Sequence, residues 1–236
     1  MAPGARLAGQ AGGAFSNAPL TLSLPEQIAA RLSERITAGT YAPGRRVMEQ
    51  EVSAEFGVSR GPVREALRLL EKDGLVTILP RRGAQVTRLS IAEVREIFDI
   101  RAALNGLRDR QIAEGPDRVQ LLPALEQSVE RLARLARNPG DADKYVERVF
   151  ELNQLLNDSA PNRRLRVILA SLALQTLRYS RLGLSTPERR LQSVGNWQRL
   201  VKALRAGDGL EAQRAAEQRV LDSRDAAIAQ LEKRDK

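Results

Sequence analysis

The side chains best suited to specific recognition are the arginines of residues 58–67, which read VSRGPVREAL. Arg60 and Arg64 stand four residues apart, so on a helix they share one flank. Each guanidinium group presents a planar fork of donors that matches the O6 and N7 atoms of guanine or two phosphate oxygens. Gly61 lies between them and leaves room for close approach of a ligand. The segment therefore predicts contacts with nucleic acid.

A second basic group is the sequence PRRG at residues 80–83, between the apolar runs 75–79 and 84–87. These runs have the residue types of short strands, which predicts a β-hairpin with a basic tip. Arg81 and Arg82 suit a DNA minor groove or its phosphates, and Gly83 allows the tight turn.

Three predicted helices position these groups. A capping box at Ser23 to Glu26 starts the first helix, which ends near Gly39. The second covers 49–55, where Gln50 lies among free backbone N–H groups that favour a phosphate. Ser59 is the expected N-cap of the third helix, whose apolar residues recur at spacings of three and four. Three helices and a basic hairpin in this order predict a winged helix-turn-helix over residues 23–89.

An alternative is that the arginines form a solvated surface paired with Glu65 and Glu71. Arginines on a third helix combined with a basic wing tip favour DNA binding instead.

Residues 25–88 resemble the N-terminal domain of the GntR family of regulators. The resemblance rests on these motifs: Ile36-x-x-Gly39, Pro43-Gly44, VSRGPVREAL at 58–67, Leu70-Glu71-x-x-Gly74-Leu75-Val76 and Arg82-Gly83. It implies that Arg60, Gly61, Arg64 and Gly83 contact DNA, and that Gln50 replaces an arginine that some relatives carry.

The rest of the chain, residues 90–236, predicts an all-α antiparallel bundle, so the fold is mainly α. Gly- and Pro-containing breaks separate six expected helices, near 91–114, 117–137, 141–158, 162–182, 187–206 and 209–233. Residues 1–22 are rich in Gly, Ala and Pro and are expected to form a disordered tail.

This second part is similar to the FCD effector domain of the FadR subfamily, and closest to its VanR-like group. The landmarks are EIFDIRAAL at 96–104, Ser159-x-x-Asn162 and Ala203-x-x-x-Gly207-Asp208. Many such domains bind a divalent metal through one Asp and three His, and the metal holds a small carboxylate. The corresponding positions here are Val149, Asn153, Trp197 and Arg219, which implies that no metal is bound.

These replacements suggest a site of another kind. Arg219, with Arg101 from the first helix of the bundle, could hold an anionic effector directly, with Asn153 as a neutral donor and Trp197 as an apolar wall. In the alternative, Trp197 fills the cavity, Arg219 pairs with a carboxylate such as Glu151, and no effector binds.

Composition limits the other possibilities. The 236 residues carry a formal charge of +9, which favours polyanionic partners such as nucleic acid. The absence of Cys and His excludes disulfides, thiol catalysis and His-based triads. No apolar run approaches the roughly 20 residues of a membrane span, and a chain without Cys needs no oxidising compartment, so we expect a cytoplasmic protein. We expect no cofactor. The sequence predicts a homodimeric regulator, not an enzyme, that represses by binding an inverted repeat in double-stranded DNA and responds to a small anion. The alternative is a regulator that has lost effector sensing.

Overall fold

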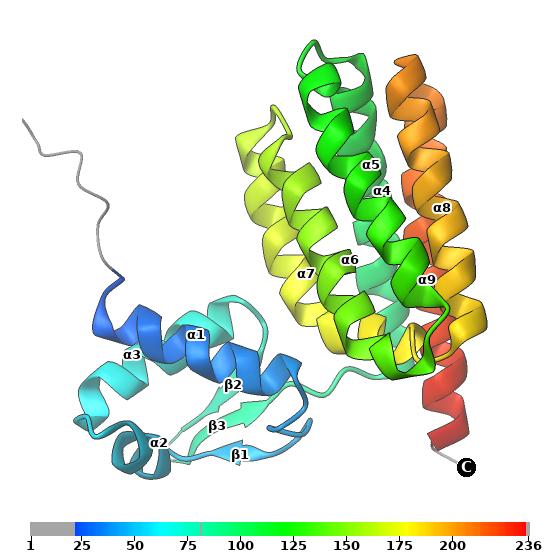
Figure 1. Cartoon of the computed structure of the whole chain (residues 1–236). Coiled ribbons are helices and arrows are strands. Elements are labelled where there is room, and N and C mark those ends of the chain that lie inside the picture. The colour runs from blue at the N-terminus through cyan, green and yellow to red at the C-terminus, as the bar shows by residue number, and fades with distance from the viewer. Residues whose placement is uncertain (1–21, 81, 235–236) are drawn as a thin grey trace, which may run out of the picture.

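A computed structural model describes residues 22–80 and 82–234. Arg81 and all but the last residue of the expected tail lie outside the described residues. The chain folds into a small N-terminal part with a sheet and a bundle of long helices (Figure 1). This agrees with the predicted fold class of a winged helix-turn-helix followed by an all-α bundle.

Three helices form most of the N-terminal part. Helix α1 (Leu24–Thr37) begins at the predicted capping box, in which the Ser23 hydroxyl accepts from the Glu26 backbone N–H and the Glu26 carboxylate accepts from that of Ser23. Helix α2 (Glu49–Phe56) ends at Gly57, whose φ of 65° is left-handed, and helix α3 (Arg60–Lys72) follows after a short turn. The three helices enclose one apolar core with the sheet.

The sheet has one more strand than the sequence predicts. Strands β2 (Val76–Leu79) and β3 (Gly83–Val86) form the predicted antiparallel hairpin, and the two-residue strand β1 (Arg46–Val47) pairs with β3 on its other side. Gly83 has a φ of 78°, and a Cβ there would lie 2.5 Å from the Val47 carbonyl oxygen. Glycine is therefore required where the wing meets β1.

The second part consists of six long helices side by side (Figure 1), each within one residue of its predicted ends. They are α4 (Ile91–Glu114), α5 (Arg118–Ala136), α6 (Ala142–Asp158), α7 (Arg163–Gly183), α8 (Pro187–Ala206) and α9 (Gly209–Arg234), with a 3₁₀ turn at Pro139–Asp141. None of the described helices is both long and apolar enough to cross a membrane.

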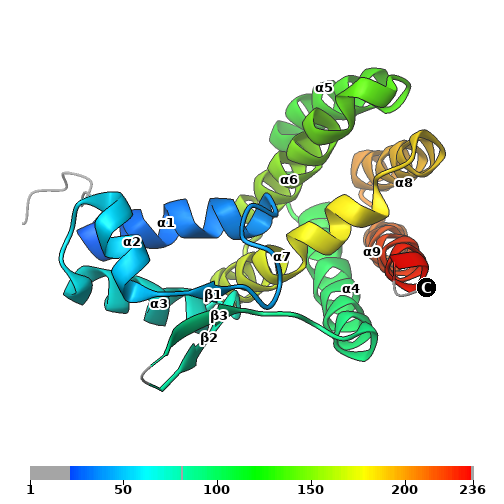
Figure 2. The same ribbon diagram turned by 90° about the horizontal axis from the view of Figure 1, so that it is seen from below.

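Helix α7 joins the two parts. It lies on the side of the bundle that faces α1 and the sheet (Figure 2). Leu174 packs against the core of the N-terminal part, and the Tyr179 hydroxyl accepts a 3.0 Å hydrogen bond from the Leu89 backbone N–H. The Arg178 side chain donates to the Thr87 carbonyl. A movement of α7 would therefore displace the residues of the N-terminal part that it contacts.

Candidate nucleic-acid interface and buried cationic cavity

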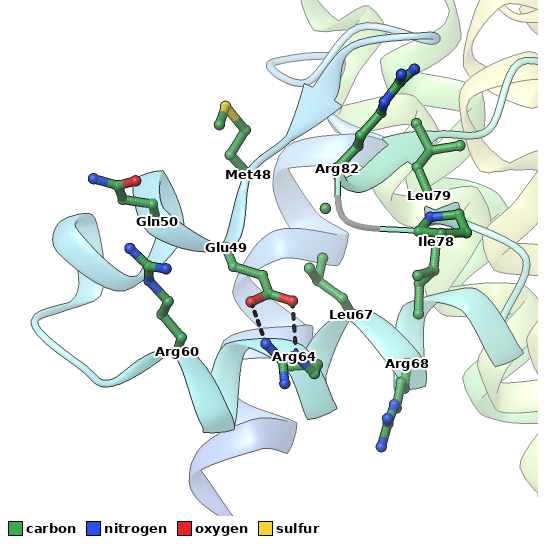
Figure 3. Close-up of a pocket in the computed structure, with 12 residues that line it drawn as sticks. Met48, Glu49, Gln50, Arg60, Arg64, Leu67, Arg68, Ile78, Leu79 and Arg82 are labelled. Carbon is green, nitrogen blue, oxygen red and sulfur yellow. Dashed lines mark hydrogen bonds and ion pairs between the residues drawn. The ribbon is translucent and has the colours of Figure 1, made fainter.

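An open groove of about 510 Å³ runs between the starts of α2 and α3 and the β2–β3 wing. Figure 3 shows Gln50 and Arg60 on the helical side of this groove and Arg82 on the wing. All three side chains are exposed. The structure therefore brings five residues of the predicted DNA-contacting set to one groove, namely Gln50, Arg60, Arg64, Arg82 and Gly83, whereas Ser59 and Gly61 are not among the residues that line it.

Arg64 is held in a defined orientation within this groove. Its Nε and Nη2 atoms donate to the two carboxylate oxygens of Glu49 at 2.9 and 3.0 Å, as the dashed lines in Figure 3 mark. The hydrogen bonds from Arg64 lower the pKa of Glu49, which keeps that carboxyl ionised. Because the Arg64 side chain is 57% exposed, a phosphate can compete for it at little cost.

The alternative pairing with Glu65 and Glu71 is wrong for Arg64. Glu65 pairs with Arg68 at 2.8 Å, and the Glu71 carboxylate accepts a 2.7 Å hydrogen bond from the Ile78 backbone N–H. Glu71 therefore fastens the wing to α3 instead of neutralising the arginines in the groove.

Ser59 and Gly61 stand at the exposed start of α3. Ser59 has the extended backbone of an N-cap, but its hydroxyl makes no capping hydrogen bond, so the prediction is right for the position and wrong for the side chain. A Cβ added at Gly61 would have no atom within 4 Å. The fold does not require glycine there, which is consistent with a role in close approach of a ligand.

The four residues proposed for the bundle site also come together. Arg219 Nη1 donates to Asn153 Oδ1 at 3.0 Å, and the Arg219 guanidinium carbon lies 3.9 Å from the centre of the buried Trp197 ring. With Arg101 they line a small cavity of about 40 Å³. Arg101 and Asn153 also line a neighbouring cavity of about 150 Å³ between α4, α6 and α7.

The expected carboxylate partner of Arg219, Glu151, is wrong. Glu151 pairs with Arg148 along α6, and the carboxylate beside Arg219 is Asp109, whose Oδ2 lies 3.6 Å from Arg219 Nη2. Asn153 accepts from Arg219, because a guanidinium group can only donate, and the Asn153 NH2 group donates to the Val149 carbonyl within its own helix. Its expected role as a donor to an effector stays a prediction.

Sequence reasoning missed three polar residues of α4 that are buried here. They are Asn105, Arg108 and Asp109, each at most 3% exposed, with Arg108 Nε 2.6 Å from Asp109 Oδ1. The signal was in the helical spacing. The apolar stripe of Val94, Phe98 and Ala102 continues at intervals of three and four through positions 105, 109 and 112, so polar residues at 105 and 109 had to face the interior.

The buried charged residues around Arg219 form a cationic cluster, which consists of Arg101, Arg108, Arg219 and the single carboxylate of Asp109. Burial, with repulsion from Arg219 and Arg108, lowers the pKa of Arg101 to about 9. Burial likewise lowers the pKa of Arg219 to about 10, although Asp109 opposes the shift. Arg101 Nη1 donates to Thr176 Oγ1 of α7 at 2.6 Å, which links the cluster to the helix that joins the two parts.

Two family models match the chain. The model described as bacterial regulatory proteins, gntR family, matches residues 24–86, and the FCD domain model matches residues 96–222. The chain is 35% identical over 139 residues to the HTH-type transcriptional regulator YdhC of Bacillus subtilis, covering 59% of this chain and 62% of that protein. It is 36% identical over 140 residues to the HTH-type transcriptional repressor RspR of Escherichia coli, covering 59% and 60%. The match thus spans about three fifths of these relatives.

The fold is also that of a solved structure. The chain of E. coli McbR/YncC superposes with a TM-score of 0.72 at 20% identity, over 89% of this chain and all of that chain. The protein therefore belongs to the FCD-domain family and carries a gntR-family winged helix-turn-helix in front of that domain.

Proposed function

We propose that the protein is a sequence-specific DNA-binding transcription regulator and not an enzyme. In this proposal residues 23–89 bind DNA, and residues 90–236 form the dimerisation and effector domain. The observation that carries it is the single groove in which the arginines at the start of α3 face the basic wing. Helix α3 enters the major groove, where Arg60 and Arg64 meet base edges or phosphates.

The other predicted residues have positional roles. Gln50 and Ser59, at the starts of α2 and α3, bind phosphates with the free backbone N–H groups of these helix ends. Arg82, with Arg81 beside it in the sequence, reaches the adjacent minor groove while Gly83 holds the turn.

We further propose that the protein acts as a homodimeric repressor on an inverted repeat. A two-fold dimer presents two recognition helices to half-sites about one helical turn apart. Repression is supported by the similarity to RspR of E. coli, which is a transcriptional repressor by name.

The proposed control is a small anion held directly by Arg101 and Arg219. By resemblance the domain is of the FadR type, VanR-like group, whose metal would need donors at positions 149, 153, 197 and 219. Valine, asparagine, tryptophan and a buried arginine do not fit a cation, and the described residues contain no cluster of three or more His, Cys, Asp or Glu suited to a metal. An anion that draws Arg101 away from Thr176 would perturb α7 and, through it, the N-terminal part.

The second candidate is a DNA-binding regulator without effector sensing. It is favoured by Trp197, which is fully buried and stacked on Arg219, and by the partners that Arg219 finds in Asn153 and Asp109. Arg219→Ala separates the candidates: the first predicts that this variant binds DNA normally and no longer releases it in response to the anion.

DNA binding itself is tested by fluorescence anisotropy of the full chain on its own promoter fragment and on a random duplex. Arg60→Ala should abolish the preference for the promoter, whereas Arg134→Ala, an exposed change on α5, should leave it unaltered. Equal affinity of the unaltered protein for both duplexes at moderate salt would refute the proposal.

A further inference from the structure

This inference rests on the proposed DNA binding by the groove and concerns how the groove distinguishes one base from another. We propose that Glu49 is a positioning residue that makes Arg64 a reader of guanine instead of a phosphate contact. The Glu49 carboxylate at the start of α2 does not itself contact DNA in this arrangement. It acts through the guanidinium group of α3 that it holds.

The first support is the way in which the two side chains are joined. A guanidinium group carries two forks of parallel donors, one formed by Nε and Nη2 and the other by Nη1 and Nη2. Glu49 fills the first fork with both carboxylate oxygens, at 2.9 Å from Nε and 3.0 Å from Nη2 (Figure 3). The second fork is left for a ligand, because the Arg64 side chain is 57% exposed. Its geometry matches the O6 and N7 atoms of guanine.

The second support is the balance of charge. Arg64 and Glu49 together carry no net charge, so a phosphate that approaches Arg64 must lie beside a carboxylate or displace it. The O6 and N7 atoms of guanine are neutral acceptors and need neither. The hydrogen bonds from Arg64 lower the pKa of Glu49, and the charge of Arg60 lowers it further, so the carboxylate stays ionised. The pair therefore favours a base edge over the DNA backbone.

The third support is the contrast with the other two arginines on this flank of α3. Arg68 donates a single hydrogen bond, from Nη1 to Glu65 Oε1 at 2.8 Å, and both of these side chains are more than half exposed. A single contact at the surface leaves the guanidinium plane free to turn. Among the described side chains that Figure 3 draws, none is bonded to Arg60. Of these three arginines, Arg64 is thus the one whose plane is fixed before DNA binds, and such preorganisation lowers the cost of a bidentate contact.

Selected binding sites test the inference. The unaltered full chain and Arg64→Gln each select sites from a randomised duplex pool, and we expect the variant to lose a guanine at one fixed position of each half-site. The affinity of the unaltered protein is then measured by fluorescence anisotropy for its selected site and for the same site with that G·C pair replaced by A·T. We expect a preference for the G·C site of roughly tenfold or more, as a good bidentate contact to a base provides.

Variants of the two carboxylates then assign this preference to Glu49. Glu49→Gln keeps the size of the side chain but cannot accept from both donors, so its preference for the G·C site should fall below about threefold. Its affinity should also decrease more steeply with salt, because the freed cation now neutralises a phosphate. Glu65→Gln is the matched control, since it removes the same charge from an exposed pair on α3 and should keep the full preference.

The full preference in Glu49→Gln would overturn the inference, and so would selection of the same guanine by Arg64→Gln. Replacement of that guanine with 7-deazaguanine, which lacks the N7 acceptor, gives a test that needs no change at Glu49. It should weaken binding of the unaltered protein and leave the affinity of Arg64→Gln as it was. No weakening, or equal weakening of both proteins, would also overturn the inference. If the unaltered protein enriched no site at all, the proposed DNA reading itself would be refuted.

Discussion

Replacing Asp109 with asparagine removes the carboxylate that faces the buried arginines while keeping the size of the side chain. Asp109 is fully buried, with Oδ1 2.6 Å from Arg108 Nε and Oδ2 3.6 Å from Arg219 Nη2. Removing one partner of a buried ion pair costs about 3–5 kcal/mol because the other charge stays buried and unpaired. Two cations lose their partner here, so we expect the free energy of unfolding to fall by an amount near the upper end of that range.

The chain offers its own probe for this measurement. Trp197 is its single tryptophan and lies in the bundle beside Arg219, so its fluorescence during urea unfolding reports the bundle. A loss of this size should lower the urea midpoint by roughly 2 M. Asp143→Asn is the matched control, because its carboxylate is 79% exposed and pairs with Arg181 at the surface, where ion pairs contribute about 0–1 kcal/mol.

If Asp109→Asn lowered the free energy of unfolding no more than Asp143→Asn does, the reasoning would be refuted, since Asp109 would then not be the counter-ion of Arg108 and Arg219. The variant should also regain stability when an anion that fills the cavity is added, because the anion takes the place of the lost carboxylate.

Three further predictions concern the wing, the groove and the link between the two parts. Gly83→Ala should lower the free energy of unfolding by about 1–2 kcal/mol because a side chain is strained at a left-handed φ, and by more because its Cβ would contact β1. The same variant should bind DNA more weakly, as measured by fluorescence anisotropy. Glu49→Gln should free Arg64 and strengthen binding to DNA several-fold at low salt. Because Arg64 lowers the pKa of Glu49, the pair forms fully above the ordinary carboxyl range and is lost only as the pH falls through that lowered pKa, so affinity of the unaltered protein should be flat from pH 6 to 8. Tyr179→Phe removes the acceptor of the Leu89 N–H and should reduce anion-induced release of DNA in a mobility-shift assay without changing anion affinity in calorimetry.

The elements that the sequence predicts well are those with local signals. The capping box at Ser23 and the Gly- and Pro-containing breaks between the bundle helices define ends that depend on nearby residues only. Strand β1 was missed because its two residues carry no periodicity and form a strand only through pairing with Gln85 and Ala84, about 40 residues later.

The groove was predictable because its basic residues lie on elements whose order fixes their arrangement. The pairing of Arg64 with Glu49 was not, since it joins two helices and depends on their packing. In the bundle the four expected residues meet, but the sequence does not single out Asp109 and Arg108, because charged residues on a helix are rarely fully buried. Following the apolar stripe of α4 through position 109 would have found the carboxylate that stabilises the cluster.

The most direct test of DNA reading by this surface is selection of binding sites from a randomised duplex pool by the full chain, at moderate salt and with Arg60→Ala in parallel. We predict that the unaltered protein enriches one inverted repeat with half-sites about a helical turn apart and that the variant loses this enrichment. Recovery of unenriched sequences by the unaltered protein, or the same repeat with Arg60→Ala, would contradict the assignment of α3 as the recognition helix.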